Sequence, residues 1–168
     1  MGFDVYGMNP KINKEQERYS VYNKYKDMEF KQKWEELDAD EDLRNQYWKE
    51  HEDYEENNPG IYFRNNVWWW RPLWSYVCEQ FPDILGERDE EGGCYNDGHA
   101  ISETKATKIG IGLTAKLESG EVEEYAKSFE QNRKSLDDDD WDKSYPFNVE
   151  NVEQFAKFCL ESGGFEIC

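Results

Sequence analysis

The sequence lacks the short signatures that identify several enzyme classes. Its 168 residues contain no GxSxG nucleophile elbow, no GxxxxGK[ST] phosphate loop, no dinucleotide-binding GxGxxG and no zinc-binding HExxH. It has no apolar run of the roughly twenty residues that span a bilayer, and residues 1–10 lack the basic region and apolar stretch of a secretory signal. These absences favour a cytoplasmic, non-enzymatic protein without a cofactor.

Basic residues are scarce relative to acidic ones. There are 20 Lys and Arg against 38 Asp and Glu, which gives a formal net charge of −18. That charge repels phosphate backbones and anionic membrane surfaces. We therefore expect no direct binding to nucleic acid or membrane, and the charge favours a basic protein as partner. A small anionic ligand is the alternative partner, and it rests on the polar residues described below. Mimicry of DNA is a further hypothesis, although the acids cluster at 36–56 and 137–142 instead of spreading along the chain.

The cysteines are few and widely spaced. None of the four forms a CxxC pair, so neither a disulfide framework nor a metal site is expected. Cys78 or Cys94 could conceivably act as a nucleophile with His99 as its base. The four are Cys78, Cys94, Cys159 and Cys168.

Hydrophobic patterning predicts a mostly α fold of the α+β class, with a small sheet made by the two chain ends. Residues 2–7 (GFDVYG) and 165–168 (FEIC) alternate as strands do, and we expect them to pair. Helices are expected at 14–37, 40–55, 101–117 and 121–135, and from Asn148 to the Gly163–Gly164 stop, with 86–93 (GERDEEGG) as an exposed loop and Gly110 and Gly112 as points of close approach.

The predicted organisation is one domain, 1–168, with an inserted acidic arm. Asn57, Asn58, Pro59 and Gly60 form a strong turn signal and therefore an internal boundary. Residues 11–56 make the helical arm, while 59–168 and 1–8 make the main folded body. Residues 36–58 hold ten acids against two bases, a net charge of −8.

Four of the seven tryptophans fall within YFRNNVWWWRPLW, residues 62–74. If Asn65 or Asn66 caps a helix running to about Phe81, Trp70 and Trp74 face the core with Trp69 beside them, and Pro72 lies on the exposed arc with Trp68. If the helix instead begins at Pro72, Trp68 lies outside the helix and its place on a helical face is not defined. The sequence leaves both registers open.

Three successive tryptophans cannot all face one side of a regular element, so at least one of them needs a second partner, which is Trp68 if the helix begins before it. The acidic arm is one candidate for covering it, with Arg71 stacking on its ring as a cation–π pair. A ligand or partner surface is the alternative.

The segments GFDVYG, YFRNNVWWWRPLW with YVCEQF, CYNDG and NVEQFAKFCLESGGFEIC are similar to a group of small uncharacterised phage and bacterial proteins. The resemblance covers about residues 1–8 and 59–168 and implies a phage or bacterial origin. It implies no activity, cofactor or residue role.

Two polar groups are candidate sites. A guanidinium fork, amides and an exposed indole together suit an anionic, nucleotide-like ligand, although helix capping and ion pairing explain the same residues. The ligand candidates are Arg64, Asn65, Asn66, Trp68, Arg71 and Asn96. Asp97 and His99 are weaker catalytic candidates, with Asp97 orienting His99 as a base.

The sequence therefore predicts a binding or interaction protein whose acidic surface engages a basic host component, in the host cytoplasm if it is phage-encoded. One alternative is a binder or sponge for a nucleotide-like ligand at Trp68 and Arg64. Another is a small hydrolase or transferase built around Asp97 and His99.

Overall fold

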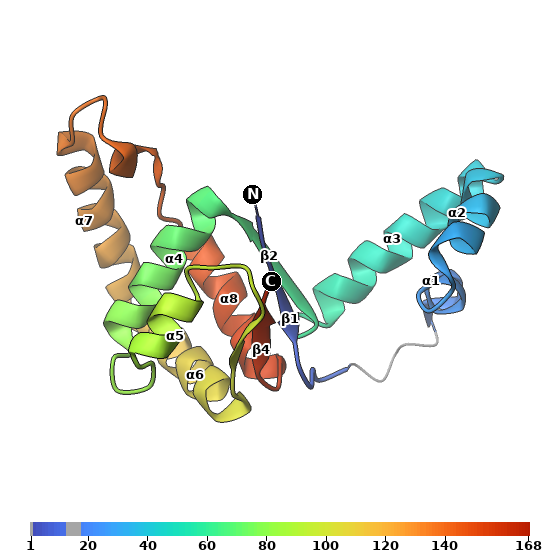
Figure 1. The fold of residues 1–168 in the computed structure, drawn as a ribbon, viewed down its shortest axis with the longest axis horizontal. Coiled ribbons are helices and arrows are strands. Elements are labelled where there is room, and N and C mark those ends of the chain that lie inside the picture. Colours follow the sequence, from blue (N-terminus) through green and yellow to red (C-terminus); the bar gives the residue numbers. More distant parts are fainter. Residues whose placement is uncertain (1, 13–17) are drawn as a thin grey trace. The chain divides into compact units, whose positions relative to one another are not determined.

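The computed structural model describes residues 2–12 and 18–168 (Figure 1). The chain divides into two compact units. The first, made of Met1–Lys11 and Pro59–Cys168, is called the main unit below, and the second, Ile12–Asn58, is called the inserted unit.

A four-stranded antiparallel sheet lies in the main unit, with strand order β2-β1-β4-β3. The predicted pairing of the two chain ends is confirmed, because β1 (Gly2–Gly7) pairs with β4 (Phe165–Ile167). The sheet is wider than expected from sequence. β2 (Tyr62–Asn66) adds to the other edge of β1, and β3 (His99–Ile101) adds to β4.

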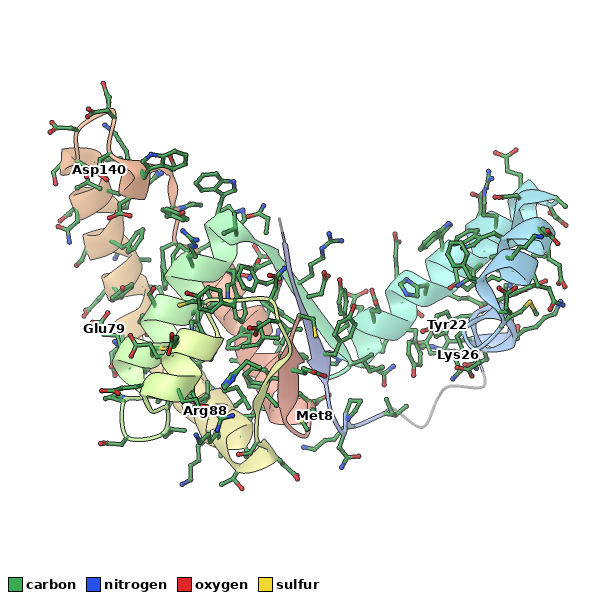
Figure 2. The ribbon with its side chains drawn as sticks, viewed as in Figure 1. Met8, Tyr22, Lys26, Glu79, Arg88 and Asp140 are labelled. Atoms are coloured by element: carbon green, nitrogen blue, oxygen red, sulfur yellow. The ribbon has the colours of Figure 1, made fainter. Side chains whose placement is uncertain are left out.

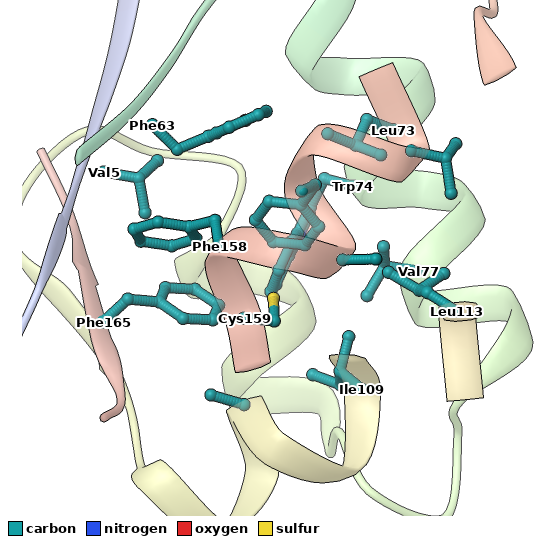
Figure 3. Packing of buried hydrophobic residues seen from close by; sticks show 14 of the residues in the cluster. Val5, Phe63, Leu73, Trp74, Val77, Ile109, Leu113, Phe158, Cys159 and Phe165 are labelled. Atoms are coloured by element: carbon teal, nitrogen blue, oxygen red, sulfur yellow. The ribbon is translucent and has the colours of Figure 1, made fainter. Parts of the chain in front are cut away.

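The sheet buries one face only, as alternation along the strands requires. Val5, Phe63 and Phe165 point into the core from three strands (Figure 3). On the opposite face the Asp4 carboxylate accepts a hydrogen bond from the Tyr62 hydroxyl and pairs with Arg64, 3.4 Å from its Nε. That face is therefore polar while the other is aromatic and aliphatic.

Four longer helices of the main unit accompany the sheet: α4 (Val67–Gln80), α6 (Glu103–Ser119), α7 (Glu121–Ser135) and α8 (Val149–Glu161). The last begins where sequence predicted, since Asn148 Oδ1 accepts from the Asn151 N–H at 3.1 Å. Its buried stripe places Phe158 and Cys159 beside core residues of the sheet and of α6 (Figure 3). The mostly α prediction with a small terminal sheet is confirmed.

The helix predicted at 101–117 begins two residues later. Ile101 belongs to β3, opposite Phe165 of β4, and it is fully buried there. Ser102 then caps α6 through its Oγ, which accepts from the Lys105 N–H at 3.5 Å. The apolar side chain of Ile101 fitted both patterns, and the strand pairing decided between them.

The prediction of an exposed loop at 86–93 is wrong. Residues Glu87–Gly92 form the short helix α5, and Asp89 within it is buried. Two indoles hold this helix in place: Trp70 Nε1 donates to the Gly93 carbonyl at 2.7 Å, and Trp74 Nε1 donates to the Glu90 carbonyl at 3.1 Å. A buried indole N–H needs such an acceptor, so α5 forms despite its polar sequence.

The inserted unit contains α1 (Ser20–Tyr25), α2 (Phe30–Asp38) and α3 (Glu41–Asn57). The single helix predicted at 14–37 is therefore two helices within the described residues, with 13–17 outside them. Asp40 caps α3 as predicted, its Oδ1 accepting from the Leu43 N–H at 3.1 Å. The core of this unit is made of Tyr25, Leu37 and Tyr47.

A carboxylate from α3 completes the start of α1. Glu50 Oε2 accepts from the backbone N–H groups of Val21 and Tyr22, both at 2.8 Å. The first N–H groups of a helix have no intrahelical partner, and a negative charge there also favours the helix dipole. Glu50 therefore ties α1 to α3 within the inserted unit.

Gly110 of α6 lies where α6 and α8 pack closely together. A Cβ at this position would lie 2.8 Å from Leu160 Cγ and 3.0 Å from the Leu160 backbone nitrogen. We expect Gly110→Ala to lower the free energy of unfolding by about 1–2 kcal/mol, because overpacking outweighs the gain in helix propensity. Urea denaturation measures this, with exposed Lys108→Ala on the same helix as control. An increase in the free energy of unfolding of Gly110→Ala would contradict a tight contact between Gly110 and Leu160.

Candidate ligand groove and aromatic strip

The helix α4 begins before Trp68, which decides between the two registers left open by sequence. Asn66 Oδ1 accepts from the backbone N–H groups of Trp68 and Trp69 at 3.0 and 3.2 Å. Pro72 then lies inside the helix, where its missing N–H leaves the Trp68 carbonyl without the usual intrahelical bond, at a cost of up to about 3 kcal/mol. It is buried, contrary to its predicted place on the exposed arc.

The tryptophans of α4 separate into core and surface. Trp70 and Trp74 are 0% and 2% exposed and stack with ring centroids 5.5 Å apart. Trp68 is 36% exposed. It stacks on Trp141, at 6.2 Å with an interplanar angle of 5°, and its ring centroid lies 5.1 Å from that of Tyr145. The second partner that Trp68 required therefore includes rings of the main unit itself.

Trp141 belongs to the 3₁₀ helix η2 (Trp141–Ser144), which follows the acidic run at 137–140. Asp140 lies at the loop after α7 (Figure 2), and its Oδ1 accepts from the Asp142 N–H at 2.9 Å. One acid of the run therefore serves as the N-cap that starts η2. Nothing in the run itself signalled the tertiary contact of Trp141 with α4.

Arg71 contacts a different ring from the one predicted. Its Cζ lies 5.7 Å from the centroid of Tyr145, and its Nη1 donates to the Tyr145 hydroxyl at 2.8 Å. The phenol offers a ring face and a hydrogen-bond acceptor together, whereas the Trp68 indole offers no acceptor. Arg71 and Tyr145 line one groove of about 390 Å³ between α4, α7 and the segment that carries η2, called the Arg71 groove below.

The other predicted ligand residues have partners inside the fold. Asn65 points inward and donates from Nδ2 to Asn151 Oδ1 at 3.0 Å, while Arg64 pairs with Asp4 on the outer face of the sheet. Asn96 Nδ2 donates to the Gly2 carbonyl at 3.3 Å, and Asn66 is the cap described above. Successive side chains of a strand point to opposite faces, so Arg64 and Asn65 of β2 lie on different faces of the sheet and cannot contact the same ligand there.

His99 has a carboxylate partner that sequence reasoning missed. Its Nε2 lies 3.1 Å from Asp89 Oδ1, and Lys105 Nζ lies 2.5 Å from Asp89 Oδ2. The ring also presses on Gly92, where a Cβ would lie 2.3 Å from His99 Cγ. Asp97 is exposed and lines the same depression as His99. Asp89 therefore joins α5 to β3 and α6.

The thiols are poorly suited to act as nucleophiles. Burial, together with the nearby Glu90 carboxylate, raises the pKa of the Cys78 thiol to about 12. Partial burial and Glu90 likewise raise the pKa of the Cys94 thiol. Because the thiolate is the reactive form, both cysteines are weakly nucleophilic at neutral pH.

A second surface feature lies on the inserted unit. Phe30 and Trp48 are 73% and 44% exposed, and the half-buried Trp34 lies between them, with ring centroids 6.2 Å from Phe30 and 5.7 Å from Trp48. His51 continues the row, 5.7 Å from Trp48. These four residues are called the aromatic strip below. They rest on buried Tyr47, which contacts Trp34, Trp48 and His51.

The helix that carries half of the aromatic strip is acidic. α3 holds seven Asp and Glu residues against Arg44 and Lys49. Toward its C-terminal half an open depression of about 600 Å³ is lined by acids of α3, together with Arg18, Tyr19, Gln46 and Lys49. The acids there are Glu50, Glu52, Asp53 and Glu56.

Over residues 2–12 and 18–168, no three His, Cys, Asp or Glu side chains are placed to share a metal ion. No helix in that described part is long and apolar enough to cross a membrane.

Comparison with protein-family models, with curated proteins and with solved structures finds no match to this chain. The resemblance to phage and bacterial proteins therefore stays a prediction.

Asp89→Asn tests the junction of α5, β3 and α6. Burial raises the Asp89 pKa, but hydrogen bonds from Lys105, His99 and the Gly86 N–H lower it more, so the pKa lies below its ordinary value. The charged form therefore stabilises the fold above the ordinary carboxyl range, and this contribution is lost as pH falls through the lowered pKa. We expect Asp89→Asn to cost about 1–2 kcal/mol at neutral pH.

The difference from the parent protein should shrink as the solution is acidified. Urea denaturation at several pH values measures it, and Asp97→Asn is the matched control because Asp97 is exposed. If the two substitutions lowered the free energy of unfolding equally at neutral pH, the contacts of Asp89 with His99 and Lys105 would not be the source of the stabilisation.

Proposed function

We propose that the protein is a non-enzymatic interaction protein, and that the aromatic strip of the inserted unit binds a basic amphipathic segment of a partner protein. The observation that carries the proposal is the exposure of large aromatic rings, with Phe30 73% and Trp48 44% exposed on one surface. If the chain is phage-encoded, as the resemblance implies, the partner would be a host protein.

Exposed aromatic rings are the most direct source of binding energy on this surface. Tryptophan is enriched among the residues that dominate protein interfaces, because it loses a large area to the partner with few rotatable bonds. Tyr47 is 4% exposed and contacts three residues of the aromatic strip, so the strip rests on a packed base. A supported ring loses less conformational entropy when a partner covers it.

Charge defines the partner class. The seven acids of α3 against two bases make a negative surface next to the rings. Such a surface speeds encounter with a basic segment and disfavours acidic ones. A partner that offers apolar side chains on one face and Lys or Arg on the other complements both features, as an amphipathic helix does.

A synthetic helical peptide of leucine and lysine tests the proposal, with fluorescence anisotropy as the measurement. We expect the parent protein to bind it and the double variant Phe30→Ala/Trp48→Ala to bind at least about tenfold more weakly, because truncating exposed aromatic anchors costs the most. Raising ionic strength from about 0.1 to 1 M, which shortens the Debye length from roughly 10 to 3 Å, should also weaken binding.

The controls separate the rings from general charge attraction. Ile111→Ala removes a side chain that is 60% exposed on α6 of the main unit, and it should bind as the parent does. Phe30→Ala alone serves if the double variant melts early, since Phe30 is the more exposed of the two rings. A double variant that is folded and binds the peptide with unchanged affinity would refute the aromatic strip as the contact surface.

A further inference from the structure

The Arg71 groove lies on the main unit and is independent of the aromatic strip. Its walls come from α4, from α7 and from the segment between Leu136 and Tyr145, which are far apart in the sequence. Its volume of about 390 Å³ lies within the range of small-molecule sites. Three rings line it: Tyr125 and Phe129 of α7, and Tyr145.

Two arginines line the groove, and they differ in what they bind. Arg133 is engaged by Glu130, with Nε and Nη2 at 2.8 and 3.1 Å from the two carboxylate oxygens, and its Nη1 donates to the Lys143 carbonyl at 3.1 Å. Arg71 donates only to the neutral Tyr145 hydroxyl within the described chain, and no described carboxylate lies within ion-pair distance of it.

Other basic residues of the described chain, such as Arg88, also have no ion pair, but Arg71 is the arginine of this groove that lacks a carboxylate partner. Asp142 lines the same groove and still does not pair with Arg71. The guanidinium is exposed, and Tyr145 orients it from one side. Arg71 is therefore held in place while part of its hydrogen-bonding fork is left for another acceptor.

We propose that the Arg71 groove binds a planar aromatic monocarboxylate. Arg71 would hold the carboxylate through two parallel N–H···O bonds, the geometry that a guanidinium and a carboxylate share. The rings of the groove would receive the ligand's aromatic body by offset or edge-to-face contact. Exposed Trp68 and Trp141 extend the aromatic surface beyond Tyr145.

The charge around the groove selects against multiply charged ligands. One guanidinium neutralises one negative charge, and Arg133 is already paired with Glu130. Asp142 and the acidic run at 137–140 repel additional negative charge. A monocarboxylate therefore suits the groove better than a nucleoside di- or triphosphate.

Isothermal titration calorimetry with 2-naphthoate tests the proposal. We expect saturable binding to the parent protein and at least about tenfold weaker binding to Arg71→Gln, because a charge-assisted bidentate contact is lost. Arg71→Lys keeps the charge without the planar fork and should lie between them. The uncharged 2-naphthamide should bind the parent at least about tenfold more weakly than 2-naphthoate.

Arg64→Gln is the matched control, because it removes the same charge from a residue that pairs with Asp4 outside the groove. It should change the affinity by no more than about twofold. The proposal is overturned if 2-naphthoate gives no saturable heat, if Arg64→Gln weakens binding as much as Arg71→Gln, or if 2-naphthamide binds equally well. Tighter binding of adenosine monophosphate than of 2-naphthoate would overturn the ligand class. If Arg71→Gln lowers the melting temperature, the 2-naphthoate affinities of Arg71→Lys and Tyr145→Phe are compared with that of the parent protein instead, and both variants should bind more weakly.

Discussion

The main unit depends on burying two stacked indoles without leaving their N–H groups unsatisfied. Trp70 is fully buried, and its ring stacks on Trp74 and, on the β1 side, on Phe3, with centroids 5.5 and 5.3 Å away. The carbonyl groups of Gly93 and Glu90 accept the two indole N–H groups. The sheet, α4 and α5 meet at this stack, so the same two side chains supply packing and fix where a polar helix must lie.

The two units separate two kinds of surface chemistry. In the inserted unit, acids and exposed rings share the short helical surface that we propose as the partner contact. In the main unit, burial of the indoles leaves Trp68 and Arg71 on the outer arc of α4, facing η2 and Tyr145. The groove there combines one unpaired cation with aromatic walls. A large partner and a small ligand would therefore meet different residues on different parts of the chain.

Apart from the pairing of the two chain ends, what the sequence predicted was local in origin. Asn148 and Asp40 cap helices within three residues of themselves, and alternation in residues 2–7 is visible without any partner strand. The helix α5 could not be predicted, because its stabilising acceptors act on indoles about twenty residues earlier in the chain. The same reason applies to the site. Arg71 was identifiable as a candidate, but Tyr145, its partner 74 residues later, carried no local signal.

The placement of the inserted unit between β1 and β2 has a consequence for loop-closure entropy. β1 and β2 are neighbouring antiparallel strands, and the Gly7 N–H donates to the Ile61 carbonyl at 2.9 Å, so the chain leaves and returns at adjacent points of the sheet. Closing a loop costs only about 0.6 kcal/mol more for each doubling of its length. A hairpin of this kind therefore tolerates a folded insertion in place of a turn, and a change within the inserted unit leaves the residues of the indole stack unchanged.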